Sequence, residues 1–256
     1  MRLTLLGTGT SGGVPQIGCQ CATCTSADPR DKRTRCSAMI ETDDACILID
    51  CGPDFRQQML ALHRPFRKID AIFITHEHYD HVGGIDDIRP GMLFGDVRIY
   101  AEDLVAQHLA ERIPYCFTPL ERRYPGVPAI TLEHMEPHQP VIVGSLTVVP
   151  IRVMHGQLPI VGFRIGPIAY ITDMKSLPDT EWQYLEGTEI LIVNALHHRY
   201  HRSHQTVDDA IRFAQRIGAR ETYFIHMSHF VLPHAQEEKL LPPNIHLAYD
   251  GMELIL

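Results

Sequence analysis

Residues 71–81 read Ala-Ile-Phe-Ile-Thr-His-Glu-His-Tyr-Asp-His, an apolar, β-branched segment followed at once by three histidines and two acidic residues. The apolar part predicts a buried strand. In an extended chain His76 and His78 project to the same side, while Asp80 and His81 reach the neighbouring space once the chain turns into a helix. The run therefore predicts ligands for two adjacent metal ions at the end of a strand.

Metal binding would also explain other histidines among the 16 in this chain. Imidazole and carboxylate together suit Zn, Mn or Fe, and a second ion about 3.5 to 4 Å from the first would hold a bridging hydroxide. A lone histidine is more often an ordinary surface or core residue than a ligand. Three histidines and Asp80 within residues 76–81, however, contribute little to a fold. His155, Asp173 and His226 also follow apolar segments, so they are preferred as additional ligands.

Short apolar, β-branched segments recur along the chain and predict strands separated by helical stretches. The clearest helix is predicted over residues 206–217, with Thr206 as its N-cap and Gly218 closing it. We find no repeat, low-complexity tract or linker, so residues 1–256 are expected to form a single domain with a sheet-on-sheet core flanked by helices. The predicted strands cover residues 3–6, 38–41, 46–50, 71–75, 97–100, 146–152, 160–165, 168–172, 190–193 and 222–225.

The composition indicates where the protein is located in the cell and which partners it binds. A formal net charge of -8 disfavours binding along a nucleic-acid backbone, because that affinity comes mainly from Lys and Arg. No apolar run approaches the roughly 20 residues of a membrane-spanning helix, and the N-terminus is unlike a secretory signal. We expect a cytoplasmic protein with a small-molecule substrate and no membrane contact.

Cys19, Cys21 and Cys24 form a C-x-C-x-x-C motif in a loop rich in small residues, and this spacing lets three thiolates converge on one zinc ion. A fourth ligand is needed, and His229 is the first candidate because a turn could direct His226 to one site and His229 to the other. His234 is the reserve. The alternatives are free thiols or a redox pair, although a redox dithiol would not need the third cysteine. The remaining four cysteines are isolated and are expected to be small buried hydrophobes: Cys36, Cys46, Cys51 and Cys116.

Together these motifs resemble a known superfamily. The histidine run, the isolated His155, the pair Thr172-Asp173 and residues 225–229 look like the metallo-β-lactamase superfamily. With residues 7–9, the cysteine cluster, residues 49–52 and residues 250–253 added, the chain is similar from end to end to the PhnP-type phosphodiesterases, which are phosphoribosyl cyclic phosphodiesterases.

The resemblance implies an α/β fold, a four-layer αββα sandwich of the metallo-β-lactamase type with both ions at one edge of the two sheets. It assigns His76, His78 and His155 to one ion and Asp80, His81 and His226 to the other, with Asp173 bridging. It also implies a structural zinc at Cys19, Cys21, Cys24 and His229, in a zinc-binding loop at about residues 18–36, and association into a homodimer.

Our hypothesis is that a bridging hydroxide attacks the phosphorus of a small phosphodiester, with a cyclic ribose phosphodiester as the leading substrate. Asp80 and His204 are the candidate catalytic residues, since His204 lies just before a helix where the family places its general acid. His201 is a weaker candidate for that role, and Arg199 or Arg202 could contact phosphate. Between residues 194 and 204 the chain looks shorter than the PhnP-type pattern, which leaves the substrate as the weakest inference.

Other functions remain open. A tRNA 3'-processing endonuclease of the same superfamily shares the ligands, but the acidic balance and the absence of a Gly/Lys-rich arm argue against it. A thioester hydrolase or β-lactamase is a weaker alternative. From another class, the chain could be a non-catalytic metal-binding or scaffolding relative. Asp50 and Gly52 are expected to orient a ligand histidine or form a turn rather than to bind metal.

Overall fold

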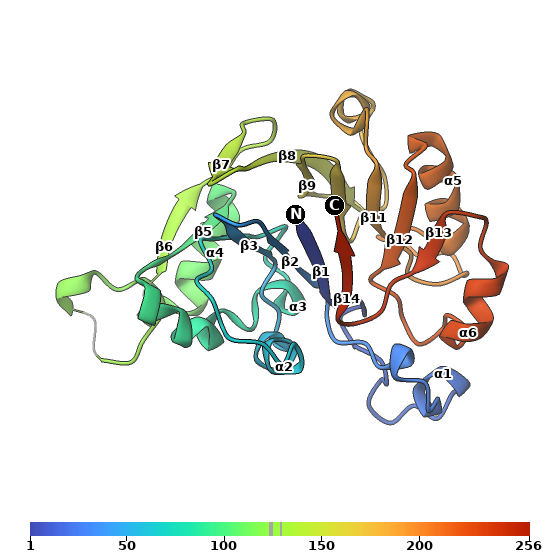
Figure 1. Ribbon diagram of the computed structural model, residues 1–256, viewed down its shortest axis with the longest axis horizontal. Helices are drawn as coiled ribbons and strands as arrows, with labels where there is room; N and C mark the ends of the chain where they lie inside the picture. The colour runs from blue at the N-terminus through green and yellow to red at the C-terminus, as the bar shows by residue number, and fades with distance from the viewer. Residues whose placement is uncertain (123–124, 129) are drawn as a thin grey trace.

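The computed structural model describes residues 1–122, 125–128 and 130–256, and its strands form two seven-stranded sheets (Figure 1). The first sheet has the order β14-β1-β2-β3-β4-β5-β6 and the second has the order β13-β12-β11-β10-β9-β8-β7. The first sheet consists of β14 (Met252–Ile255), β1 (Arg2–Gly7), β2 (Ser37–Glu41), β3 (Cys46–Ile49), β4 (Ala71–Phe73), β5 (Val97–Ala101) and β6 (Ile130–His134).

The second sheet consists of β13 (Ile245–Leu247), β12 (Glu221–Ile225), β11 (Ile190–Asn194), β10 (Ile168–Ile171), β9 (Leu158–Ile165), β8 (Leu146–His155) and β7 (Val141–Val143). The α-helices are α1 (Ala22–Thr25), α2 (Phe55–Ala61), α3 (Tyr79–Val82), α4 (Asp103–Arg112), α5 (Val207–Ile217) and α6 (His234–Glu237). Short 3-10 helices cover Pro29–Asp31, Ile85–Phe94, Pro114–Phe117, Leu120–Arg122, Asp179–Leu185 and Glu238–Leu240.

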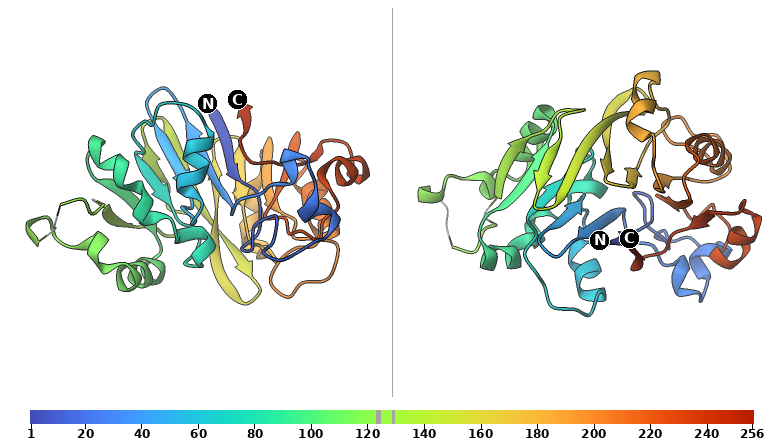
Figure 2. Two further views of the ribbon diagram at one scale, coloured as in Figure 1. Left: turned by 90° about the horizontal axis from the view of Figure 1, so that it is seen from below. Right: turned by 45° about the horizontal axis from the view of Figure 1, so that its top comes forward.

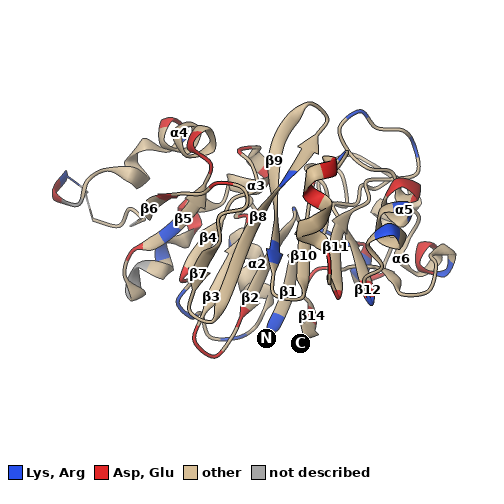
Figure 3. Ribbon diagram, turned by 90° about the horizontal axis from the view of Figure 1, so that it is seen from above, with Lys and Arg blue, Asp and Glu red and all other residues tan. Residues whose placement is uncertain are grey.

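The two sheets pack face to face, with helices on their outer faces, so the predicted four-layer αββα sandwich is confirmed (Figure 2). On one side α2 and α4 pack against the first sheet, and on the other α5 packs against the second. Charged residues lie largely on helices and loops, while the strands carry few of them (Figure 3). Among the described residues, we find no helix with the length and apolarity needed to cross a membrane.

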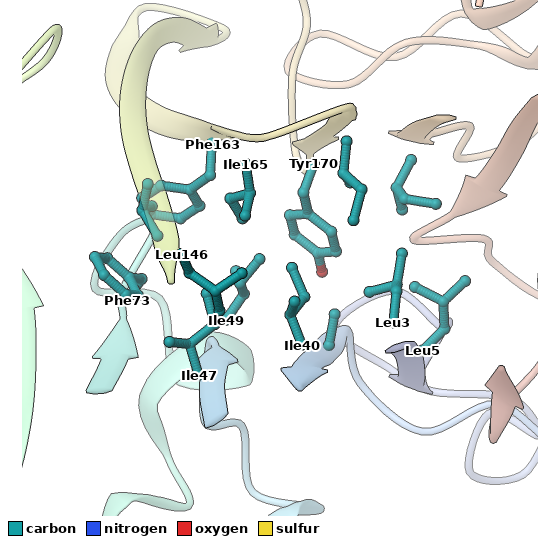
Figure 4. Packing of buried hydrophobic residues seen from close by; sticks show 14 of the residues in the cluster. Leu3, Leu5, Ile40, Ile47, Ile49, Phe73, Leu146, Phe163, Ile165 and Tyr170 are labelled. Carbon is teal, nitrogen blue, oxygen red and sulfur yellow. The ribbon is translucent and has the colours of Figure 1, made fainter. Parts of the chain in front are cut away.

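The alternation of side chains along each strand builds the layers. In β3, Ile47 and Ile49 point into the cluster between the sheets, whereas Cys46 and Leu48 belong to the cluster beneath the outer helices. A strand buried on both faces reads as a continuous apolar run, which is why β3 was visible in the sequence. Figure 4 shows side chains of the two sheets meeting in the central cluster, with Phe73 and Phe163 packed edge to face at 5.7 Å.

All ten strands predicted from the sequence are present, and so is the helix over residues 206–217. Thr206 and Asp209 form a reciprocal capping box at the start of α5, and Gly218 ends it with φ 70°. The sequence analysis missed β6, β7, β13 and β14. All four are edge strands that are short or partly exposed, so their pairing depends on a neighbouring strand more than on an apolar run.

The connectivity of the two sheets determines which edge carries the candidate site residues. Strands β3 to β6 are parallel in the first sheet, and β10 to β13 are parallel in the second. Parallel neighbours end at the same edge of a sheet, and in open α/β sheets that carboxyl edge is where ligands bind. The segments after β3, β4, β10 and β12 carry Asp50, His76, Asp173 and His226.

Candidate metal centre

Side chains from both sheets converge at this edge. The imidazole centroids of His76 and His78 lie 4.5 Å apart, and His155 lies 5.7 Å from His76 and 5.3 Å from His78. The ring centroid of His81, which lies in α3, is 4.3 Å from that of His76. The structure therefore brings together the whole set that the sequence analysis named for the active site: His76, His78, Asp80, His81, His155, Asp173 and His226.

Four of these residues form one tight group. Asp80, His81, Asp173 and His226 each offer a ligand atom, and these atoms all lie within 4.8 Å of one another. Nε2 of His81 is 3.2 Å from Oδ2 of Asp80 and 3.3 Å from Oδ1 of Asp173, while Nε2 of His226 is 3.2 Å from the same Asp173 oxygen. These four side chains have the donor types that a divalent transition metal takes.

Asp173 also belongs to a second group. His155, Asp173 and His204 bring their ligand atoms within 4.8 Å of one another, and Nε2 of His76 lies 4.0 Å from Oδ2 of Asp173. The two carboxylate oxygens of Asp173 thus face different sets of imidazoles. His204 enters this second group directly, although the sequence analysis placed it only as a proton donor.

Several nitrogen atoms in the centre are buried without a hydrogen-bond partner. Within the described part of the chain these include Nε2 of His81, Nε2 of His226 and Nδ1 of His204. Leaving a buried polar atom unsatisfied costs about 1–3 kcal/mol, so such atoms need an explanation. Imidazole and carboxylate donors aimed at one small volume are the ligand set that divalent transition metals take, and the residues fit such ions.

Neighbouring groups fix the orientation of the ligand imidazoles. Nδ1–H of His81 donates to Oδ2 of Asp50 at 2.7 Å, and the backbone N–H of Thr75 donates to the other carboxylate oxygen at 2.8 Å. The Nδ1–H of His155 donates to the carbonyl oxygen of Asp173 at 2.8 Å. In a neutral imidazole a bond from Nδ1–H leaves Nε2 as the acceptor nitrogen, and Nε2 of His81 lies among the carboxylates of the centre. Asp50 therefore has the orienting position that the sequence analysis gave it.

The backbone is strained at three points of the centre. Asp50, Asp173 and His226 each follow a strand and adopt φ values of 58°, 56° and 55°. Non-glycine residues in this region cost of order 1–3 kcal/mol each and persist where the surroundings over-determine them. Nearby, a Cβ added to Gly52 would lie 2.1 Å from the carbonyl oxygen of Asp80, so the close approach of these two loops requires glycine.

Electrostatics favours the protonation states that metal binding needs. Burial lowers the pKa of His76 well below its ordinary value, with His81 adding to the effect. Burial opposes ionisation of Asp173, yet His226 and His81 hold its pKa well below the usual range. His81 is the exception, because Asp173 and Asp50 outweigh burial and raise its pKa. Burial and the nearby His226 lower the pKa of His204 to about 2, which leaves this imidazole neutral.

The cysteine motif forms a second cluster. Cys19, Cys21, Cys24 and His229 bring their ligand atoms within 4.8 Å of one another, and Nδ1 of His229 lies 3.2 Å from the sulfur of Cys19. This donor set fits a closed tetrahedral zinc site. His234 does not take part, because its Nδ1 accepts a hydrogen bond from Arg33 at 3.1 Å. The other cysteines are buried in the apolar clusters, as expected: Cys36, Cys46, Cys51 and Cys116.

Other features of the site were not visible in the sequence. The side chain of Asn194, at the end of β11, accepts from the backbone N–H of Met174 at 2.8 Å and donates to its carbonyl at 3.0 Å, which holds the segment after Asp173. Of the two arginines that the sequence analysis named for phosphate contact, Arg199 places its guanidinium 5.2 Å from the ring centroid of Phe230, and Arg202 is exposed. For the role of Asn194, the only signal in the sequence was an asparagine at the end of an apolar strand.

Comparisons with known proteins find related sequences and related folds. Residues 46–227 match the family model described as beta-lactamase superfamily domain. A protein of Porphyromonas gingivalis named octanoyltransferase is 46% identical over all of this chain, which spans 52% of that protein's length.

Two solved structures match nearly the full length. The crystal structure of a new diphosphatase from the PhnP family has a TM-score of 0.91 and 38% identity, and the match covers 100% of this chain and 97% of that one. Zn²⁺-bound PqqB from Methylobacterium extorquens has a TM-score of 0.83 at 20% identity and covers both chains fully, which shows a shared fold.

Proposed function

Because the chain belongs to the beta-lactamase superfamily, whose members are generally metal-dependent hydrolases, we propose that it hydrolyses a small phosphodiester. A cyclic ribose phosphodiester is the first candidate substrate. The carrying observation is the position of Asp173, whose two carboxylate oxygens face different groups of buried imidazoles. The similarity of the whole chain to a PhnP-family structure supports phosphate chemistry.

In this proposal the converging residues hold two divalent ions, Mn, Zn or Fe. His76, His78 and His155 would hold one ion, Asp80, His81 and His226 would hold the other, and Asp173 would contribute to both. Such ions supply Lewis-acid activation of water and neutralise charge on phosphate oxygens. PqqB, which shares the fold, was solved with Zn²⁺ bound, so a member of this fold class takes a divalent metal. The cysteine cluster, in the loop at about residues 18–36, would hold a structural zinc.

The chain's own residues supply orientation and proton handling. Asp50 and Thr75 hold His81 in the tautomer that presents Nε2, so the ligand lone pair does not have to be reorganised. His204, whose Nδ1 lies 3.9 Å from Oδ2 of Asp173, would carry the proton to the leaving oxygen. Because burial keeps this imidazole neutral, it would need the phosphate anion beside it to hold that proton.

The names of two relatives point to other bonds that the protein could cleave, and the assay of activity includes them. The PhnP-family relative is a diphosphatase, so a phosphoanhydride is a second phosphate substrate for the same centre. The Porphyromonas gingivalis relative favours an octanoyl ester or thioester as a candidate from acyl chemistry. Since this chain spans 52% of that relative, the octanoyl chemistry can belong to the other half of it.

The remaining alternatives are weaker. A tRNA-processing nuclease needs a basic surface for the phosphate backbone, whereas Lys and Arg here are interspersed with Asp and Glu (Figure 3). A scaffolding protein would not need ligand atoms that are buried, oriented by Asp50 and left without partners. A nuclease would cleave precursor tRNA and a scaffolding protein would cleave no substrate, so one substrate panel separates both from a phosphodiesterase.

The test combines metal analysis with a substrate panel. The full chain, loaded with Mn or Zn, is assayed on bis(p-nitrophenyl) phosphate, a cyclic ribose phosphodiester, a nucleoside diphosphate derivative, precursor tRNA and an octanoyl thioester. We expect turnover of the phosphodiesters, abolished by a chelator and restored by metal. Turnover of the thioester alone would replace phosphate chemistry by acyl chemistry. Protein that holds its ions and hydrolyses none of these substrates would be non-catalytic.

A further inference from the structure

An apolar pocket with a volume of about 270 Å³ lies on the outer face of the first sheet. Its walls come from α2, from the segment that follows α2 and from the 3-10 helix Ile85–Phe94. The described residues that line it include none of the candidate metal ligands, so the proposed hydrolysis does not use this pocket. Its apolar wall is formed by Met39, Phe55, Met59, Leu60, Phe66 and Ile69.

The pocket reaches down to side chains of the core. Met39, Phe55 and Ile69 each keep only 2% of their surface exposed, and they belong to the apolar cluster beneath the outer helices of the first sheet. Protein interiors leave few voids larger than a water molecule. Water finds few hydrogen-bond partners on such a wall, whereas apolar cavities accept apolar molecules. The volume is close to the lower end of the roughly 300 to 1,000 Å³ of small-molecule pockets, so the pocket fits a short apolar group.

Charged side chains also line this pocket, and they favour an anion. They are Arg56, Arg64, Arg67, Glu41 and Asp87, so the arginines outnumber the acidic residues. The carboxylate of Glu41 is already neutralised, because it lies 2.6 Å from Nη2 of Arg64 and 3.7 Å from Nη1 of Arg67. Arg56 is exposed and forms no ion pair with any residue that the structure describes. Its guanidinium is therefore available to an anionic ligand.

The apolar pocket adjoins a polar one. Glu41 and Arg67 also line a neighbouring pocket of about 370 Å³, together with the polar residues Arg2, Thr42 and Asp43. A ligand with an apolar body and a charged head matches this change from an apolar wall to a polar surface. A purely apolar ligand would leave Arg56 without a partner. A guanidinium matches the planar geometry of a carboxylate, with which it forms two parallel hydrogen bonds.

We propose that this pocket binds a small monocarboxylate with an apolar body, the chemical class of short and medium-chain fatty acids. The body packs against Phe55, Met59 and Phe66, and the carboxylate pairs with Arg56. The inference goes beyond the proposed hydrolysis and does not depend on it, because the two sites share none of the described residues.

Binding is measured by isothermal titration calorimetry on the metal-loaded full chain. The ligands are straight-chain carboxylates of increasing length, from butyrate to decanoate, and the 1-alkanol of each length. Burial of a methylene predicts that affinity rises roughly fourfold with each added carbon and levels off once the pocket is full. The alkanol should bind more weakly than the carboxylate of the same length, because it carries no charge for Arg56.

Variants then locate the ligand. Arg56→Gln should weaken carboxylate binding on the order of tenfold and leave alkanol binding unchanged, while Arg56→Lys, which keeps the charge, should restore most of the affinity. Arg98→Gln, another exposed arginine that lies in β5 and outside the pocket, is the matched control. Met59→Trp fills the pocket and should abolish binding of both kinds of ligand. Thermal unfolding checks that this variant is folded, and the surface variant Arg56→Gln carries the test if it is not.

Three results would overturn the proposal. Carboxylate binding that Arg56→Gln and Met59→Trp leave unchanged would place the ligand elsewhere, for instance on the active-site ions. Equal affinity for carboxylates and alkanols would make this a site for neutral apolar molecules. A concentration-dependent dimer that Met59→Trp dissociates, without carboxylate binding, would identify the pocket as a contact between copies of this chain. Absence of phosphodiester hydrolysis would overturn the proposed function alone, because calorimetry of this pocket needs no turnover.

Discussion

The two candidate metal sites are built in opposite ways. The ligands of the active centre come from segments that begin at His76 and end at His226, and the ends of parallel strands bring them together. At the cysteine cluster, three ligands lie within residues 19–24, and only His229 is distant. The first site is thus assembled by the packing of two sheets, while the second is assembled by a loop whose shape the metal itself would hold.

The contrast is sharpest at the short segment that serves both sites. His226 and His229 are three residues apart, yet they point to different clusters. The left-handed backbone of His226, at φ 55°, ends β12 and turns the chain between them. Met227 pairs with the loop after β1, accepting from the N–H of Thr10 at 3.0 Å and donating to the carbonyl of Thr8 at 3.1 Å. Preformed architecture should therefore keep the active centre intact when the cysteine cluster is lost.

The largest effect is expected at the residue shared by both groups of imidazoles. Asp173→Asn keeps the shape of the side chain but removes the negative charge that faces His81 and His226. We predict that kcat/KM falls on the order of 10³-fold or more, since several kcal/mol of transition-state stabilisation depend on the ions that this carboxylate holds. Inductively coupled plasma mass spectrometry should show loss of active-site metal and retention of one zinc.

The exposed Asp179→Asn serves as the control for Asp173→Asn and should keep metal and turnover. Loss of all metal from Asp173→Asn, including the zinc of the cysteine cluster, would contradict the separate construction of the two sites.

The second largest effect concerns His204, whose position fits both a proton donor and a ligand. As a donor, His204→Ala should keep its metal content and lose about 10²- to 10⁴-fold in kcat on diesters with poor leaving groups, while p-nitrophenyl esters change little. The comparison of leaving groups measures this directly. A variant that loses one active-site ion, with equal effects on both kinds of ester, would move His204 into the ligand set.

An intermediate effect is expected where the fold orients a ligand. Asp50→Asn offers an amide in place of the carboxylate that accepts from Nδ1–H of His81. Changing such an orienting partner typically costs 10- to 100-fold in metal affinity or activity. Competition with a chelator measures the affinity, and Thr75→Val, which removes a second hydrogen bond to the same carboxylate, should show a smaller loss. Unchanged metal affinity in Asp50→Asn would mean that sheet packing alone sets the ligand geometry.

The sequence predicted the active centre better than it predicted the edges of the sheets. Apolar runs such as residues 71–75 are buried on both faces, and the histidines after them mark the strand end by their chemistry. In contrast, β13 and β14 are short strands whose partners are β12 and β1, and pairing across such distances leaves no local pattern. For the same reason the sequence could not show that Asn194 holds the segment after Asp173 or that Asp50, Asp173 and His226 share a left-handed backbone.

The cysteine cluster should give the smallest effect on turnover and a clear effect on stability. Cys21→Ser removes one of three thiolates, so the protein should lose one zinc and keep its active-site ions. Each 1 kcal/mol of lost stability lowers Tm by roughly 2–4 °C in a domain of this size, and calorimetry measures that shift. Hydrolysis of small phosphodiesters should stay close to wild type, because the sheets hold the candidate ligands at the end of β8 and after β4, β10 and β12. Loss of the active-site ions together with the zinc would show that the loop organises both sites, and the distinction between the local and the assembled site would fail.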